Sequence, residues 1–307
     1  MANVSEFDLI YRYLASLGAG PAVALGVGDD CAILKLNEGE WLATSVDTVV
    51  EAVHFPTESF PEDVAYRAVA VAASDLAAMG ARPLAMTLAL TLPQADELWL
   101  HACSEGLAAA VSDFGLPLVG GDTSRGPLAL SVQVFGALPA RTGLLRSGAR
   151  VGERLCVSGT LGDGAAGLAV VKGQWQGSVA DGDYLEQRYY RPSARLELGQ
   201  LLLGVASAAI DISDGLLADA GHIAAASGVK IAIESTQLPL SAALQRHPDR
   251  EQVLRWALVG GDDYELCFTL PPQMPLPQNC TVIGWVEEGD GVVCDVKPGG
   301  QTGYRHF

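Results

Sequence analysis

The feature that most constrains the fold is an apolar stretch that contains a single pair of polar side chains. Residues 68–81 have only Ser74 and Asp75 as polar members, within a helix predicted from 61 to about 79. A helix that is apolar on almost every side is buried on almost every side, so we expect other elements to cover it. Asp75 is then a carboxylate in apolar surroundings, which is costly without a strong partner.

The partner of Asp75 is either a local group or a metal ion. A nearby hydroxyl or a buried arginine would satisfy the carboxylate without any function. The composition favours a metal ion, because 36 Asp and Glu residues are set against only 19 Lys and Arg. Similar aspartates, beside glycine, serine or threonine and next to apolar runs, recur at 29–30, 47, 122, 211 with 214, and 262–263. Such hard oxygen ligands suit Mg²⁺, which indicates phosphoryl chemistry.

The formal net charge of −17 argues against binding to nucleic acid or to an anionic membrane. Bound divalent metal would reconcile this charge with a phosphate-bearing substrate. The most apolar region, residues 68–92, is interrupted by Asp75, Arg82 and Pro83, so no transmembrane helix is expected. No signal peptide is apparent, and the six cysteines form no Cys-x-x-Cys pair. We therefore expect a cytoplasmic protein with free thiols and no structural zinc.

Strands and helices mix in both halves of the chain, which predicts an α/β or α+β class. The predicted helices cover 6–17, 61–79, 94–113, 162–172, 193–206 and 213–226. The predicted strands cover 31–36, 41–46, 84–92, 117–120, 128–137, 154–157, 208–212, 229–233, 266–270, 281–286 and 291–296. The polar, basic segment 139–153 is the predicted junction between domains 1–138 and 150–307. Residues 173–185, polar and glycine-containing, are a candidate mobile segment.

Several of the aspartates lie where strands are predicted to end. Asp47 and Asp122 each follow such a strand and precede a threonine, and strand ends are where α/β proteins place ligands. Asp211 also ends a strand, and Ser213 is a plausible cap for the next helix, whose free N–H groups would favour phosphate. Asp214 either opposes the helix dipole or binds metal, and its position alone does not decide between them.

Familiar nucleotide motifs do not explain the chain. Residues 162–167 match the dinucleotide pattern Gly-x-Gly-x-x-Gly, but Asp163 would oppose a pyrophosphate, so a close-packed helix start is the better interpretation. There is no P-loop and no protein-kinase signature. His54 follows the strand that carries Asp47, which makes it a candidate for substrate binding. Arg146 has the right side chain for a phosphate clamp, although it could equally be a solvated linker charge.

Taken in order, the motifs from residues 26–30 to residues 303–307 resemble the thiamine-monophosphate kinase family, within the aminoimidazole ribonucleotide synthetase superfamily. The resemblance implies a two-domain α/β (α+β) fold of the aminoimidazole ribonucleotide synthetase type and a homodimer in which the N-terminal sheets pair. It implies ATP-dependent phosphorylation of thiamine monophosphate to thiamine diphosphate, with several Mg²⁺ ions and ATP as co-substrate. No nucleic acid or membrane partner is expected.

The resemblance also assigns site residues. The metal ligands would be Asp30, Thr44, Ser45, Asp47, Asp75, Asp122, Asp211 and Asp214. The contacts to ATP would be Gly121, Asp122, Arg146 and Ser213, and those to the thiamine substrate His54, Asp262 and Tyr304. Two positions depart from the family pattern: Asp262 replaces a common glutamate, and Ala52 replaces a common glycine.

The implied reaction is a direct in-line transfer that depends on positioning and electrostatics. The acceptor is a phosphate oxygen that is already largely deprotonated, so no general base is expected. Three alternatives remain: a ligase of the aminoimidazole ribonucleotide synthetase type, a metal-dependent phosphohydrolase, and a nucleotide sensor without turnover. The reactive N-terminal cysteine of selenophosphate synthetase and the cysteine-bearing tail of the hydrogenase-maturation relative are absent.

Overall fold

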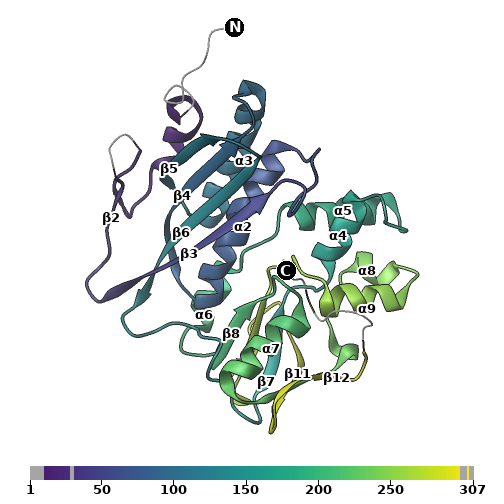
Figure 1. Cartoon of the computed structure of the whole chain (residues 1–307). Helices are drawn as coiled ribbons and strands as arrows, with labels where there is room; N and C mark the ends of the chain where they lie inside the picture. The colour runs from purple at the N-terminus through teal and green to yellow at the C-terminus, as the bar shows by residue number, and fades with distance from the viewer. Residues whose placement is uncertain (1–9, 28–30, 298–302, 304–307) are drawn as a thin grey trace. The chain divides into compact units, whose positions relative to one another are not determined.

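The computed structural model describes residues 10–27, 31–297 and 303 (Figure 1). The chain divides into two compact units, one made of residues 1–76 and 81–141 and the other of residues 77–80 and 142–307. Each unit has its own sheet and helices, which confirms the predicted α/β (α+β) class. The main division, at residue 141, falls inside the polar segment where the sequence predicted a junction.

The first unit is built on a four-stranded sheet with the strand order β3-β6-β4-β5. The strands are β3 (Glu40–Val50), β4 (Arg82–Leu92), β5 (Leu118–Arg125) and β6 (Ala129–Pro139). Only β4 and β5 are parallel. Helices α2 (Pro61–Met79) and α3 (Glu97–Phe114) cover one face of the sheet (Figure 1). Leu88, Leu130 and Val132, which alternate with exposed or half-buried residues, are buried on that helix-covered face.

The N-terminal segment does not follow the predicted pattern. Residues 6–17 were predicted to be one helix; from residue 10 the structure shows a short π-helix (Ile10–Leu14) and a 3-10 turn (Ala15–Gly18). The strand predicted at 31–36 is reduced to β2 (Ile33–Leu34), and it pairs with β1 (Val23–Leu25). Strand β3 pairs with β6 along its whole length, and not with β2.

The second unit has a six-stranded sheet with the order β12-β9-β11-β7-β10-β8, antiparallel except for β12 and β9. Its strands are β7 (Arg154–Ser158), β8 (Ala208–Asp211), β9 (Lys230–Ile233), β10 (Leu266–Leu270), β11 (Cys280–Glu287) and β12 (Gly291–Cys294). Its helices are α4 (Asp163–Val171), α5 (Val179–Tyr190), α6 (Leu196–Leu202), α7 (Leu216–Ser227), α8 (Ala242–Arg246), α9 (Arg250–Val259) and the 3-10 turn Ser235–Gln237.

Two helical regions of this unit bear on the predictions, and one of them differs from its prediction. The candidate mobile segment 173–185 overlaps helix α5, which begins after its cap Ser178, whose hydroxyl accepts the Asp181 N–H at 3.1 Å. Helix α5 forms because Leu185 and Tyr189 are buried on its inner face. At 162–167 the close-packed interpretation holds, since a Cβ on Gly164 or Gly167 would lie only 2.2 Å from a backbone oxygen.

Two further sequence expectations concern membranes and thiols. Within the described part of the chain, no helix is both long and apolar enough to cross a membrane. All six cysteines carry free thiols.

Candidate active site

Three of the predicted metal ligands lie where strand β3 packs against helix α2. Side chains alternate along β3, and Ser45 and Asp47 share the more buried, helix-covered face with Val49. The Ser45 hydroxyl donates a short hydrogen bond to Oδ2 of Asp75 on α2. Asp75 is half-buried, whereas its neighbour Ser74 is completely buried. Asp75 therefore sits at the edge of the apolar packing, where its carboxylate can meet both a hydroxyl and an ion.

Two other predicted ligands project from the opposite face of the same sheet. Asp122 is in register with Ala89, Ser131 and Thr48, whereas Asp47 belongs to the adjacent row. Residues in one row of a sheet share a face and adjacent rows alternate, so Asp122 and Asp47 lie on opposite faces. Oδ2 of Asp122 accepts a hydrogen bond from the Ser124 hydroxyl at 2.8 Å.

Thr44 shares the open face with Asp122, because it precedes Ser45 on β3. Its hydroxyl is 3.3 Å from Nε2 of Gln133, which donates to it. Its side chain therefore points away from Asp75, and only its carbonyl oxygen could join the ligands on the helix-covered face.

The expectation that Asp47 and Asp122 stand at strand ends is wrong. Strand β3 continues three residues beyond Asp47, and β5 continues three residues beyond Asp122. Both are edge strands of the four-stranded sheet. An edge strand has one free side that water can reach, so it tolerates polar residues that a sequence pattern assigns to a loop.

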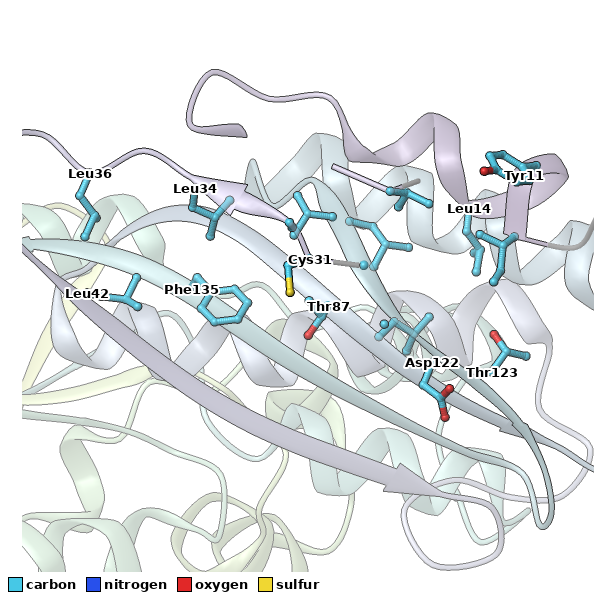
Figure 2. Close-up of a pocket in the computed structure, with 18 residues that line it drawn as sticks. Tyr11, Leu14, Cys31, Leu34, Leu36, Leu42, Thr87, Asp122, Thr123 and Phe135 are labelled. Atoms are coloured by element: carbon cyan, nitrogen blue, oxygen red, sulfur yellow. The ribbon is translucent and has the colours of Figure 1, made fainter. Parts of the chain in front are cut away.

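A cavity of about 880 Å³ lies between the open face of this sheet and the N-terminal segment. Figure 2 shows Leu34 and Leu36 of that segment facing Leu42 and Phe135 of the sheet, with Asp122 towards the other end. The cavity is mostly apolar, and Gly120, Gly121 and Thr123 also line it.

Gly121 is fixed by packing. Its φ is +149°, and a Cβ there would lie 1.9 Å from the carbonyl oxygen of Leu88. Any larger residue would push β5 away from β4 and displace the neighbouring Asp122.

The arrangement of the sheet separates the predicted metal ligands. Strands β3 and β5 are three strand spacings apart, which places Asp47 and Asp122 on the order of 14 Å from each other at about 4.8 Å per spacing. A Mg²⁺ ion binds its oxygens at about 2.1 Å, so one ion cannot contact both residues of one chain. Among the described residues, no group of three or more His, Cys, Asp or Glu side chains is already arranged to hold a metal.

His54 lies in the turn that follows β3. Its ring Nδ1 accepts the backbone N–H of Val50 at 3.0 Å, and the backbone N–H of His54 donates to the Val50 carbonyl at 2.9 Å. The neutral ring therefore carries its proton on Nε2. Ala52, in the same turn, has a φ of +62°, which explains why a glycine suits this position.

A second group of predicted residues surrounds the loop between β8 and α7. Asp211 is buried at the end of β8, and helix α7 begins only at Leu216, so Ser213 is not its cap as predicted. Oδ2 of the buried Asp219 accepts the N–H groups of residues 213, 214 and 215 at 3.0–3.1 Å. These N–H groups are therefore bonded to Asp219, contrary to the expectation that they would be free to bind phosphate.

Asp219 was not identified from the sequence. Burial, with the nearby charges of Asp211 and Asp214, raises the pKa of Asp219 to about 7. Asp219 lies inside the helix predicted at 213–226, four residues after Gly215, and an acidic residue at such a position has no distinctive sequence signal.

Asp262 lies against the same loop. Its N–H donates to the Ser213 carbonyl at 3.0 Å, and its Oδ1 accepts the Tyr264 hydroxyl at 3.1 Å. A Cβ on Gly261 would lie 2.2 Å from that Ser213 oxygen, so the two segments touch backbone to backbone. The second unit thus brings together Asp211, Ser213, Asp214 and Asp262.

Arg146 is anchored at the other end of helix α7. Its carbonyl accepts the Ser227 hydroxyl at 3.3 Å, and the neighbouring Leu145 carbonyl accepts the Ala209 N–H at 2.9 Å. Ser213 precedes the start of α7, and a twelve-residue helix spans roughly 18 Å. Arg146 and Ser213 of one chain therefore cannot clamp the same phosphate. Asp30 and Tyr304 lie outside the described residues.

Comparison with known proteins decides the family. Residues 28–138 match "AIR synthase related protein, N-terminal domain", and residues 150–297 match the corresponding C-terminal domain. The chain is 50% identical to the thiamine-monophosphate kinase of Escherichia coli K12, over 98% of both chains. It belongs to the thiamine-monophosphate kinase family.

Solved structures agree with this assignment. A thiamine-monophosphate kinase from Stenotrophomonas maltophilia K279a superposes with a TM-score of 0.84 at 42% identity, covering 90% of this chain and 92% of that one. A structure described as AaThiL complexed with AMPPCP and TMP gives a TM-score of 0.81 at 34% identity, covering 100% and 98%. The family and the two-domain fold that the motifs suggested are confirmed, and so is the prediction of a kinase.

Proposed function

We propose that this chain transfers the γ-phosphoryl group of ATP to the phosphate of thiamine monophosphate, giving thiamine diphosphate and ADP. The carrying observation is the full-length similarity to AaThiL, a family member solved with AMPPCP and TMP. The anionic chain fits this reaction only if cations join the phosphates, because its acids outnumber its bases by 36 to 19.

The oxygen-bearing side chains of the candidate site suit Mg²⁺. Ser45, Asp47 and Asp75 present oxygen atoms at the contact between β3 and α2, and Asp211 and Asp214 do so around the loop before α7. Oxygen-only ligands of this kind suit Mg²⁺. When bound, the metal neutralises phosphate oxygens and stabilises the charge of an in-line transfer. The proposed metal set also contains Asp30, Thr44 (through its carbonyl) and Asp122.

The remaining roles are those of positioning. Gly121, Asp122, Arg146 and Ser213 would contact ATP, and His54, Asp262 and Tyr304 the thiamine substrate. The bond from the Val50 N–H fixes Nδ1 of His54 as an acceptor and orients the ring in the turn after β3. No side chain needs to remove a proton, because the attacking phosphate oxygen is already ionised near neutral pH.

The separation of Asp47 from Asp122 favours a homodimer with a shared site. The two residues lie on the two edge strands of the first unit's sheet, and Leu42 and Val46 of β3 are exposed apolar residues. If β3 of one protomer pairs with β5 of another, the two sheets close on each other and both edges are covered. Asp47 and the partner subunit's Asp122 are then on adjacent strands instead of three spacings apart, still on opposite faces of the joined sheet. Two chains can contribute to one site in this way, without a single ion having to contact both carboxylates.

The test is a product assay with ATP, Mg²⁺ and thiamine monophosphate. We expect thiamine diphosphate and ADP in equal amounts from the wild-type protein. Release of inorganic phosphate without acceptor would instead indicate a phosphohydrolase, and ATP binding without turnover would indicate a sensor. ATP turnover only with the substrate of an aminoimidazole ribonucleotide synthetase would indicate the ligase.

Asp75→Asn tests the metal assignment. The amide removes a charge that the bound metal needs, so we expect thiamine diphosphate formation to fall about 100-fold or more at saturating Mg²⁺. The melting temperature should change little, because Asp75 is half-buried and Asn can still accept from Ser45. Asp113→Asn is the matched control, since Asp113 likewise accepts a hydroxyl bond, from Tyr66 at 2.9 Å. Near-normal turnover in Asp75→Asn would exclude the role of Asp75.

A further inference from the structure

The segment 261–265 contains two residues in an unfavourable backbone conformation. Asp262 has a φ of +70° and Tyr264 a φ of +52°. Non-glycine residues rarely adopt this left-handed region, and each instance persists only where the surrounding structure enforces it. Something next to Asp262 and Tyr264 must therefore hold them in place.

The residues between and after them provide that constraint. Asp263 is almost completely buried, and its two oxygens accept the N–H groups of Gly162 at 2.7 Å and Gly164 at 3.0 Å. Both carboxylate oxygens of Asp263 are therefore bonded to the start of helix α4. A Cβ on Gly164 would lie 2.2 Å from the Asp262 carbonyl, so the same contact fixes the backbone of Asp262 directly.

Glu265 anchors the other side of the segment. It is fully buried and accepts the Ser158 hydroxyl at 2.5 Å, Nη2 of Arg188 at 3.0 Å and Nε of Arg195 at 2.6 Å. Side chains alternate here: Asp263 and Glu265 point into the unit, while the carboxylate of Asp262 meets the hydroxyl of Tyr264. The two buried acids thus flank and fix the pair Asp262–Tyr264.

We propose that Asp263 is a positioning residue for thiamine monophosphate, acting through the backbone of Asp262, with the Tyr264 hydroxyl orienting the Asp262 carboxylate. The inference rests on the proposed function, in which Asp262 contacts that substrate. An aspartate has only two side-chain torsions, so the backbone decides where its carboxylate lies. A shift at Asp262 would weaken the contact with thiamine monophosphate most, because, of this unit's proposed ATP contacts, only Ser213 adjoins this segment.

The experiment compares Asp263→Asn, Asp262→Ala and the double variant, with KM for each substrate, kcat and melting temperature measured for all. Asn offers one acceptor oxygen where Asp263 offers two, so one buried N–H of α4 loses its bond. We expect KM for thiamine monophosphate to rise about tenfold, while KM for ATP and kcat stay within about twofold. The double variant should bind thiamine monophosphate no worse than Asp262→Ala, because both substitutions remove the same contact, the one between Asp262 and the substrate.

Asp181→Asn is the matched control. Asp181 is another buried acid of this unit, paired with Arg246 and accepting the Ser178 hydroxyl at 2.8 Å. Asp181→Asn should lower the melting temperature, and it should not raise KM for thiamine monophosphate more than KM for ATP. A merely structural role for Asp263 would give the same result in Asp263→Asn, or losses that add fully to those of Asp262→Ala, and either outcome would overturn the proposal.

Tyr264→Phe covers the case in which Asp263→Asn does not fold. It keeps the ring and removes only the hydroxyl that binds Asp262, and KM for thiamine monophosphate should rise about threefold. An unchanged KM in a folded Tyr264→Phe protein would contradict the proposal. If the wild-type protein forms no thiamine diphosphate, the proposed function fails instead, and the two failures are thereby distinguished.

Discussion

Ala52 occupies a backbone conformation that costs an alanine free energy. Its φ is +62°, and its N–H is held by the Phe55 carbonyl at 2.8 Å, so the turn cannot relax without losing that bond. The side chain is exposed and packs against little. We expect Ala52→Gly to raise the free energy of unfolding by about 0.5 kcal/mol or more, because steric relief exceeds the added backbone entropy of glycine. Urea unfolding measures the change.

Ala108→Gly is the matched control for this prediction. Ala108 is exposed in the interior of helix α3, where the backbone is regular. The same exchange there should lower the free energy of unfolding by about 1 kcal/mol. If both variants lose stability to the same extent, the conformational cost assigned to Ala52 is wrong.

The sequence identified the candidate carboxylates but not the directions in which they point. Asp47 and Asp122 have similar neighbours in sequence, namely an apolar run before and a threonine after. Their faces depend on the register of four strands, and a shift of one residue moves a side chain to the other face. That register is set by pairings between distant segments such as β3 with β6. A local pattern contains no information about such pairings.

At the scale of elements, a half-buried ion pair joins the edge strand β3 to β4. Nη2 of Arg82 donates to both oxygens of Glu40 at 2.8 and 3.0 Å, and Asn37 donates to the same carboxylate. The bonds from Arg82, with those from Asn37, lower the pKa of Glu40 from 4.5 to about 2. The charged carboxylate is therefore favoured in the folded state.

This pair predicts a pH dependence of stability. A group whose pKa is lowered on folding contributes stability above its unfolded pKa, and the contribution is lost as the pH falls through the folded value. Between pH 4.5 and about 2, the wild-type protein should lose stability more steeply than Glu40→Gln. Urea midpoints measured across this range test the prediction. Parallel curves for the two proteins would show that Glu40 titrates normally.

The accuracy of the predicted elements follows from how local their signals are. Helix α2 was predicted correctly at both ends, because Pro61 marks its start and Gly80, at a φ of +70°, follows its last residue. Helix α5 was missed, because its polar residues and Gly182 give little helical preference. Burial of Leu185 and Tyr189 decides its structure instead, and packing of this kind overrides propensity.

At the scale of the whole molecule, the question is whether one chain contains a complete site. In the first unit, Ser45, Asp47 and Asp75 lie on the helix-covered face of the sheet, while Asp122 lies on the other face and on the opposite edge strand. The proposed dimer removes the separation along the sheet, because it places the two residues on adjacent strands of two chains, so that each chain contributes to both sites. Sequence motifs cannot show this, because they do not reveal which of two identical chains supplies a residue.

Complementation between two inactive variants distinguishes a shared site from a site within one chain. Asp47→Asn and Asp122→Asn should each be inactive as homodimers. In the mixed dimer one site collects both substitutions and the other collects none. An equal mixture that exchanges subunits freely should therefore recover about a quarter of wild-type activity, since half of the dimers are mixed and each has one intact site.

The control for this experiment mixes Asp47→Asn with Asp75→Asn. These two residues face the same contact between β3 and α2 of one chain, so every site in every dimer keeps one defect and no activity should return. Subunit exchange is confirmed by co-purification of two differently tagged chains. Recovery in the control would show that Asp47 and Asp75 do not belong to the same chain's contribution to a site. No recovery in the test mixture despite exchange would place Asp47 and Asp122 in a site formed by a single chain. The sheet of the first unit would then have to rearrange on binding, because its strand order holds the two residues on opposite edges.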